Sequence, residues 1–397
     1  MPDDGSLTAE AVQEDASLRR DWQRFALGVF LFMFGFAMHN GVFQNWFKEA
    51  QGARELDLGI LESSREVPGL LTALTAGLLA AMAEARVAAI GLAVTAIGIG
   101  VTGWMPGIPA VIAISVFWSV GFHLFATMQS PITLTLARGK EGGRHLGRMS
   151  SVSAIATICG LGSAWLMAQL LPKGQYLPYF VVSGVLILGG AVALGTLSHH
   201  SAGGERKPIV FRREYGLYYL LSFLEGCRRQ IFSIFASFTL IVVFEVPVQN
   251  MLALQLLNAV LIALTAPKMG KIIDRYGERG PLMWYAIGLI AVFVGYATSQ
   301  TVMVLYVLYI VDNVLFTFGN GFTTYLHRIV RPGELTPCVS MGITMNHIAA
   351  VTVPVGGAYL WKQSGNYQLP FWVGVVIAVV SLVATRFIPE RPAVAAA

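Results

Sequence analysis

Ionisable side chains inside long apolar runs are the residues of this sequence best suited to chemistry, and the densest group is Glu225, Arg228 and Arg229. On a helix, Glu225 lies one turn before both arginines and within ion-pair reach of each. One carboxylate cannot neutralise two guanidinium groups, and a charge buried among apolar groups requires a partner. The spacing predicts that Arg228 and Arg229 bind an anionic ligand group or a carboxylate on a facing helix.

Asp312 lies near the middle of another apolar run, with no basic residue within helical reach along the chain. A desolvated carboxylate without an obligatory partner suits a proton carrier. A static salt bridge from Asp312 to Arg228 or Arg229 remains open as a second interpretation. Asp312 is therefore the first candidate for proton coupling, followed by Glu225 and Glu66.

A third charged group, Glu62, Arg65 and Glu66, repeats the same helical spacing nearer the outer third of its run. We interpret Glu62 and Arg65 as a gate network that pairs across to the other half of the chain. A structural ion cluster close to the membrane surface remains open as the alternative.

Other polar side chains at similar depth are candidates for ligand binding. These are Asn40, His123, Asn320 and His347. A lone intramembrane histidine usually hydrogen-bonds a neighbouring helix. His347 is a stronger candidate for ligand binding because Met345 and Asn346 precede it at the same depth. Met341, Met345 and Cys338 are soft donors near one another, yet 14 methionines are spread over the chain and methionine is ordinary apolar filler. We predict no metal site and no cofactor.

The composition requires a membrane around these groups, because 55% of the 397 residues are hydrophobic, 12% are charged and the mean hydropathy is +0.64. Apolar runs long enough for helices to cross the hydrocarbon core recur along the chain. The predicted fold class is therefore an all-α integral membrane protein with twelve transmembrane helices. The predicted runs are 25–46, 57–82, 87–104, 109–137, 149–171, 177–197, 216–243, 249–267, 281–298, 301–327, 337–360 and 369–388.

The runs divide into two sets of six around a polar break. We predict a disordered tail at 1–21, a six-helix half at 22–198, a linker at 199–214, a second half at 215–389 and a tail at 390–397. Most of the 27 lysines and arginines lie in segments that share a side with the N-terminus. The positive-inside rule therefore places both termini and the linker in the cytoplasm. The scattered basic residues do not indicate nucleic-acid binding.

A short charged turn, G-K-I-I-D-R-Y-G-E-R at residues 270–279, joins two of these runs. It is similar to the G-x-x-x-D-R/K-x-G-R/K motif that the major facilitator superfamily carries in cytoplasmic loops. The resemblance implies two six-helix pseudo-repeats, a central cavity lined by helices 1, 4, 7 and 10, and alternating access. The turn at 80–86 in the first half lacks the motif, so this gate is predicted for one half only. The resemblance assigns gating to five residues of the segment 270–279, which are Gly270, Asp274, Arg275, Gly277 and Arg279.

The resemblance implies a secondary transporter in a bacterial-type inner membrane, and no nucleotide-binding or catalytic motif indicates an enzyme. Four acids and three arginines inside the spans are nearly balanced, so we expect a small anionic or zwitterionic organic solute, coupled to protons. The expected partners are that solute, the coupling ion and the lipid bilayer, with the protein as a monomer. Efflux of amphipathic toxic compounds remains an alternative, as does a non-transporting membrane sensor or assembly factor.

Overall fold

The computed structural model is entirely helical over the residues it describes, which are 9–78, 82–137, 142–198, 211–331, 334–390. Each predicted apolar run coincides with one helix or with a run of consecutive helices. The first six are α1 (Ala9–Glu49), α2 (Glu55–Leu78), α3 (Glu84–Val101) with η1 (Thr102–Trp104), α4 (Ile108–Leu136), α5 (Gly142–Leu170) and α6 (Leu177–Gly195).

The remaining helices continue this pattern, with two of the runs broken into segments. They are η2 (Arg213–Tyr215), α7 (Gly216–Gln230), η3 (Ile231–Ala236), α8 (Ser237–Val242), α9 (Val248–Tyr276), α10 (Arg279–Thr298), α11 (Val302–Leu315), η4 (Phe316–Gly319), α12 (Asn320–Ile329), α13 (Leu335–Ser364) and α14 (Leu369–Thr385). We call α1–α6 the first group and α7–α14 the second group.

Nine helices in the described part of the chain are long and apolar enough to cross a membrane, and α14 is a shorter apolar helix. The predicted all-α membrane fold is thus confirmed, and the twelve-span count is consistent with it. Neither α2 nor α7 is among the nine. These two helices carry the charged groups Glu62–Arg65–Glu66 and Glu225–Arg228–Arg229, which explains their lower apolar content.

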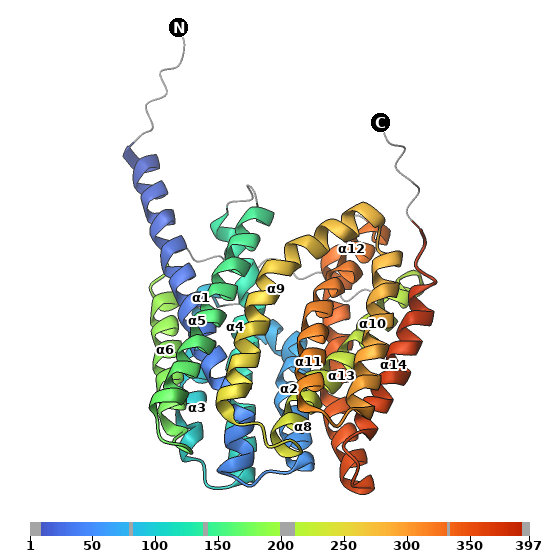
Figure 1. Ribbon diagram of the computed structural model, residues 1–397. Coiled ribbons are helices and arrows are strands. Elements are labelled where there is room, and N and C mark those ends of the chain that lie inside the picture. Colours follow the sequence, from blue (N-terminus) through green and yellow to red (C-terminus); the bar gives the residue numbers. More distant parts are fainter. Residues whose placement is uncertain (1–8, 79–81, 138–141, 199–210, 332–333, 391–397) are drawn as a thin grey trace.

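Figure 1 shows the two groups side by side, with the start of α1 and the end of α14 on the same side of the molecule. We call this the terminus side and the other the opposite side. Within the first group, glycines allow close helix packing. A Cβ added at Gly91 of α3 would lie 2.6 Å from the backbone oxygen of Gly121 on α4, and Gly184 of α6 packs equally closely on Gly100. Small residues at such crossings are typical of membrane helix pairs.

Side-chain hydrogen bonds join the two groups toward the opposite side. The Lys48 ammonium donates to the Ile241 carbonyl oxygen at 3.2 Å, and the Asn45 amide donates to the Val246 carbonyl oxygen at 3.3 Å. Gln249 of α9 donates to the Ala168 carbonyl oxygen of α5 at 3.1 Å. These residues lie where α1, α5 and α8 end and α9 begins, so the groups are fastened together at that side.

Helix α2 packs against α13 of the other group. The Ser63 hydroxyl accepts a hydrogen bond from the backbone N–H of Val355 at 3.0 Å. Val355 directly follows Pro354 in α13. A Cβ at Gly59 would lie 2.4 Å from the Ala358 Cβ, so the two backbones approach closely. The α2–α13 contact therefore extends from the opposite side to the centre of the molecule.

The N-terminal segment differs from the prediction of a disordered tail at 1–21, because α1 begins at Ala9. Alanine, glutamate and arginine, which are good helix formers, recur in this segment. Asp21 is fully buried and accepts hydrogen bonds from the backbone and hydroxyl of Ser198. Most of the predicted linker, 199–210, and the tail 391–397 lie outside the described residues.

Candidate functional site

A cavity of about 360 Å³ is lined by residues of both groups. Its wall is mostly polar, with five side-chain amides, three hydroxyls and four charged groups. The lining residues are Asn40, Gly41, Phe43, Gln44, Asn45, Glu62, Arg65, Glu66, Arg229, Gln230, Ser233, Ile234, Ser237, Ile241, Gln255 and Tyr309. Its volume lies in the range of small-molecule sites, and the polar side chains of both groups can orient a ligand within it.

The cavity wall on the second group includes a π-helical turn, η3, between α7 and α8. A π turn widens the helix locally, and such turns often occur at functional sites. Ser233 and Ile234 of this turn line the cavity, and Gln230 and Ser237 flank it. The apolar run 216–243 gave no sequence signal for this irregularity.

The neighbouring arginines of α7 have opposite environments. Successive residues of a helix point about 100° apart. Arg229 is exposed and lines the cavity, whereas Arg228 is 2% exposed and faces α11. Arg229 forms no ion pair with any side chain that the structure describes. We predicted that both arginines bind an anionic ligand group or a carboxylate on a facing helix; in the structure Arg228 binds such a carboxylate, that of Asp312, and Arg229 faces the cavity.

We call Glu225, Arg228, Tyr285 and Asp312 the closed cluster, because these side chains enclose one another. Arg228 donates to both Asp312 oxygens at 2.9 and 3.1 Å and to Glu225 Oε1 at 2.9 Å. The Tyr285 hydroxyl donates to the other Glu225 oxygen at 2.7 Å. Arg228 is the bridging cation between two acids, so the expected surplus of positive charge is absent at this residue. The family resemblance implied a cavity lined by the helices that carry Arg228 and Asp312, but neither residue is among the described lining residues.

We call Glu62, Arg65 and Glu66 the open cluster, because all three line the cavity. Arg65 pairs with Glu62 of its own helix and lies over the Trp118 ring of α4, 5.3 Å from its centroid. The sequence interpretation expected Glu62 and Arg65 to pair with the other group. They pair with each other instead, because the i, i+3 spacing already brings them together.

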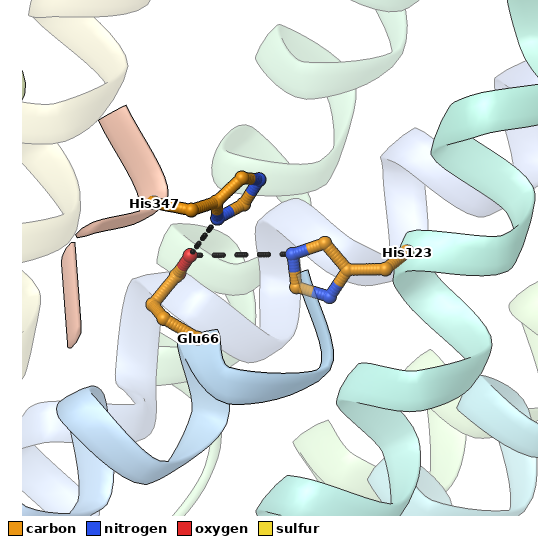
Figure 2. Close-up of side chains that lie close together, drawn as sticks. All are labelled: Glu66, His123 and His347. Carbon is orange, nitrogen blue, oxygen red and sulfur yellow. Dashed lines mark hydrogen bonds and ion pairs between the residues drawn. The ribbon is translucent and has the colours of Figure 1, made fainter. Parts of the chain in front are cut away.

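Glu66 makes the contact between the groups that Glu62 and Arg65 do not. Its carboxylate oxygen Oε2 lies 3.1 Å from His347 Nδ1 on α13 and 4.0 Å from His123 Nε2 on α4. Figure 2 shows the carboxylate of α2 pointing between the two imidazole rings. His123 Nδ1 lies 2.9 Å from the Ser119 carbonyl oxygen one turn earlier in α4. We call Glu66, His123 and His347 the triad.

Among the other predicted binding residues, Asn40 and Arg229 line the cavity. His123 and His347 are not among the lining residues but contact Glu66, which is. The side chain of Asn320 lies outside the described part of the chain. Lining residues that sequence reasoning missed are mostly uncharged amides and hydroxyls. They are Gln44, Asn45, Gln230, Ser233, Ser237, Gln255 and Tyr309. Their occurrence inside apolar runs was the available signal, but such groups also hydrogen-bond neighbouring helices.

The charged segment 270–279, which we expected to form a turn, is mostly helical: residues 270–276 end α9, Arg279 begins α10, and only Gly277 and Glu278 lie between the two helices. Gly277 ends α9 with φ +74°, a left-handed conformation that favours glycine. Arg279 pairs with Glu390 at 2.7 Å, and buried Glu278 pairs with Arg328 of α12 at 3.2 Å. These ion pairs lie within the second group. Asp274 and Arg275 are exposed, and Gly270 has open space at its Cβ position.

The sequence matches the family model of the Major Facilitator Superfamily over residues 25–336. The chain belongs to the Major Facilitator Superfamily. It is accordingly a multi-span membrane transport protein and not an enzyme. Comparison with curated proteins finds no match.

Solved structures of Major Facilitator Superfamily transporters share this fold over nearly the whole chain. The nucleoside transporter NupG is 15% identical, with a TM-score of 0.74, and the match covers 93% of this chain and 98% of that one. A bacterial homologue of the iron transporter ferroportin, in an inward-facing state, is 14% identical, with a TM-score of 0.76 and coverage of 92% and 98%. The inward-open xylose transporter XylE from E. coli is 12% identical, with a TM-score of 0.73 and coverage of 95% and 98%.

Proposed function

We propose that this protein is a proton-coupled secondary transporter of a small zwitterionic or anionic organic solute, which binds in the central cavity. The observation that carries the proposal is Arg229, an exposed guanidinium without an ionic partner among the described side chains, in a cavity shared by both groups. A guanidinium in this position can bind a carboxylate or phosphate through two parallel hydrogen bonds.

The charge balance of the cavity favours a zwitterion. Its four charged groups are Glu62, Arg65, Glu66 and Arg229, which sum to zero. The pairing of Arg65 with Glu62 leaves Arg229 and Glu66 as the other two charged groups that line the cavity, and one oxygen of Glu66 also contacts His347. A solute with one anionic and one cationic group would satisfy both, while the amides of Asn40 and Gln255 orient its polar body.

This lining is a poorer match for amphipathic efflux cargo. Among the described residues, the aromatic side chains that line the cavity are Phe43 and Tyr309. Trp118 and Phe235 are instead buried within their own groups. Apolar cargo requires apolar walls, whereas this cavity presents hydrogen-bonding groups to its ligand.

The closed cluster supplies the proposed proton site. Asp312 and Glu225 share one guanidinium, Arg228, so the three charges sum to minus one. A proton bound by Asp312 would remove that excess and free Arg228 to pair with Glu225 alone. Because α7 also carries Arg229, this exchange can change the position of the cavity wall. Glu66 is the second proposed proton acceptor, at the contact between the groups.

The proposed cycle is rocking of two six-helix halves, 22–198 and 215–389, around the cavity. The distribution of lysine and arginine supports cytoplasmic termini in a bacterial-type inner membrane. In that orientation the hydrogen bonds of Lys48 and Asn45 close the extracytoplasmic side. The turn from Gly270 to Arg279 would act as the cytoplasmic gate of one half.

The test of the solute site is a thermal-shift screen of zwitterionic, anionic and neutral polar compounds on the purified protein, followed by counterflow in proteoliposomes. A hit should bind wild-type protein and should lose about 2–4 kcal/mol of binding free energy in Arg229→Ala, because a charge-assisted bidentate contact is removed. Arg54→Ala, at a loop arginine outside the cavity, is the matched control. Unchanged binding in Arg229→Ala would refute the site.

The test of coupling is Asp312→Asn, which keeps the side-chain shape and removes the titrating group. We expect counterflow to persist while accumulation driven by a proton gradient is lost. Wild-type accumulation in the variant would remove Asp312 from the coupling mechanism. Absence of solute flux under any gradient, in wild-type protein that binds the solute, would indicate a sensor.

A further inference from the structure

We propose that the triad of Glu66, His123 and His347 is a binding site for a divalent transition-metal ion of the zinc type, and that the bound ion holds the two groups together. The ligand atoms come from three helices, α2, α4 and α13 (Figure 2). All three ligand atoms lie within 4.8 Å of one another. This proposal goes beyond solute transport and does not depend on the identity of the solute.

The distances require only a small contraction around an ion. Zinc binds histidine nitrogen and carboxylate oxygen at about 2.0–2.2 Å, which places the ligand atoms of a tetrahedral site about 3.4 Å apart. Glu66 Oε2 is already 3.1 Å from His347 Nδ1 and 4.0 Å from His123 Nε2. Rotation of the two imidazole rings toward the carboxylate would supply the remaining movement. Water would occupy the fourth position.

The backbone of α4 prepares His123 as a ligand. Its Nδ1 lies 2.9 Å from the Ser119 carbonyl oxygen, which can only accept a hydrogen bond. The proton therefore belongs on Nδ1, and the Nε2 lone pair faces Glu66. A histidine fixed in this way by a second hydrogen bond is typical of protein metal sites.

Gly69 provides the space in which the two rings meet. A Cβ added at Gly69 would lie 2.4 Å from His123 Nε2 and 2.4 Å from His347 Cε1. Because real Cβ atoms do not approach so closely, any side chain at this position would push the rings apart. The glycine thus keeps both imidazoles within reach of Glu66, one turn earlier on α2.

The site is reachable and has a selective donor set. Glu66 lines the cavity, and the Glu66 and His347 side chains are each 18% exposed, so an ion can enter through the cavity. Two imidazoles with one carboxylate favour zinc and its neighbours over magnesium or calcium, which prefer oxygen ligands. The nearby cation Arg65 pairs with Glu62, which reduces its repulsion of a bound ion.

A bound ion would link the groups, because Glu66 and His123 belong to the first group and His347 to the second. Separation of α2 from α13 would then require loss of a metal ligand. We therefore expect zinc to favour the arrangement described here, in which the opposite side is fastened by Lys48 and Asn45.

Calorimetric titration of the purified full-length protein with zinc chloride tests the site without any solute. Wild-type protein should bind one ion, and His347→Gln and His123→Gln should each bind about 100-fold more weakly, at the upper end of what changes around a metal ligand cost. Gly69→Ala, which retains all three ligands, should weaken binding by about 10- to 100-fold. Magnesium should give no heat of binding.

His145→Gln is the matched control, because His145 lies on α5 against Trp22, away from the triad, and its loss should leave zinc affinity unchanged. Thermal melting without zinc verifies that each variant is folded. The site is refuted if wild-type protein binds no zinc, or if both triad histidine variants bind it as tightly as wild type. Equal loss in His145→Gln would also refute it.

The link between the groups is tested by electron paramagnetic resonance distances between nitroxides at Ser150→Cys and Lys271→Cys, two exposed positions on the terminus side of α5 and α9, with Cys159 replaced by alanine. Zinc should favour the arrangement in which the opposite side is fastened and the labelled terminus side is apart. In the labelled protein, the distribution of nitroxide distances should therefore become narrower and shift toward its longest component. It should have no effect when His347→Gln is added. An unchanged distribution in zinc-bound protein would refute the link while leaving the site intact.

Discussion

The open and closed clusters contain similar residues in opposite surroundings. Both begin with a glutamate one turn before an arginine, Glu62 with Arg65 and Glu225 with Arg228. In the open cluster the charges line a cavity and touch the other group through Glu66. In the closed cluster Arg228 is 2% exposed and its partners all belong to the second group. The same local spacing therefore supports ligand contact in one helix and internal cohesion in the other.

The difference arises from the neighbours of each helix. The charged side chains of α7 reach two further helices: Asp312 of α11 accepts hydrogen bonds from Arg228, and the Tyr285 hydroxyl of α10 donates to Glu225. Helix α2 faces the cavity and α13, so part of its charge remains available. A charged pair inside a membrane protein thus indicates a site only after its partners from other helices are known.

The largest expected effect tests the cohesive role of the closed cluster. Arg228→Ala leaves the carboxylates of buried Asp312 and partly buried Glu225 without their shared cation and should lower the free energy of unfolding by about 3–5 kcal/mol. Arg229→Ala, the adjacent arginine, should change it by less than about 1 kcal/mol because this side chain is exposed. Thermal unfolding in detergent measures both. Equal effects at the two positions would break the comparison.

A smaller effect is expected at Tyr285→Phe, which removes only the hydroxyl that donates to Glu225 at 2.7 Å. A hydrogen bond to a charged group contributes about 1.5–3 kcal/mol, so the variant should be destabilised within that range. Tyr306→Phe on α11, which lies outside both clusters, serves as the control. No destabilisation in Tyr285→Phe would mean that Glu225 is held by Arg228 alone.

The contact between the groups near the open cluster should be weaker still. Ser63→Ala removes the acceptor for the Val355 N–H and should cost about 1 kcal/mol. This bond joins α2 to α13, so its loss should let the two groups separate at the opposite side and approach each other at the terminus side. We therefore also expect a shorter average distance between nitroxides at Ser150→Cys and Lys271→Cys. Ser64→Ala, at the next position, is the matched control. A stability loss as large as that of Arg228→Ala would contradict the ranking.

A surface ion pair provides the lower end of the scale. Hydrogen bonds from Arg212 and Tyr215 hold the pKa of Glu334 below its usual value of 4.5. Folding is therefore favoured by ionised Glu334 above that value, and this contribution is lost as the pH falls through the lowered pKa. Glu334→Gln should reduce the melting temperature by about 1 °C at pH 7. The difference in melting temperature between wild-type protein and Glu334→Gln should vanish in acid. A difference that grows as the pH falls would contradict the expected pH dependence.

The sequence predicted the helices well and the partners of their polar residues poorly. Each apolar run became a helix because lipid leaves backbone groups no other way to be satisfied. We interpreted Glu62 and Arg65 as pairing across the two halves, whereas they pair on one helix, and one partner of Arg228, Asp312, lies 84 residues away along the chain. Both interpretations of Asp312 were open because its distance to Arg228 depends on helix packing.

The cavity wall was the least predictable part. Arg229 and Asn40 were recognisable because charged and amide groups are rare in apolar runs. Ser233 and Ser237 were not, because their exposure to the cavity depends on the π turn of η3. The triad was missed as a unit for a similar reason. Its members come from α2, α4 and α13, and no spacing along the chain relates them.

The long separation of Arg228 from Asp312 has a consequence for biosynthesis. At about 5–20 residues per second, Asp312 is made about 4–17 s after Arg228. During that interval α7 is poorly suited to the bilayer on its own, because Arg228 has only Glu225 of its own helix as a nearby acid. We therefore expect α7 to settle at full depth only when α11 emerges. The second half of the protein would then insert as a unit and not helix by helix.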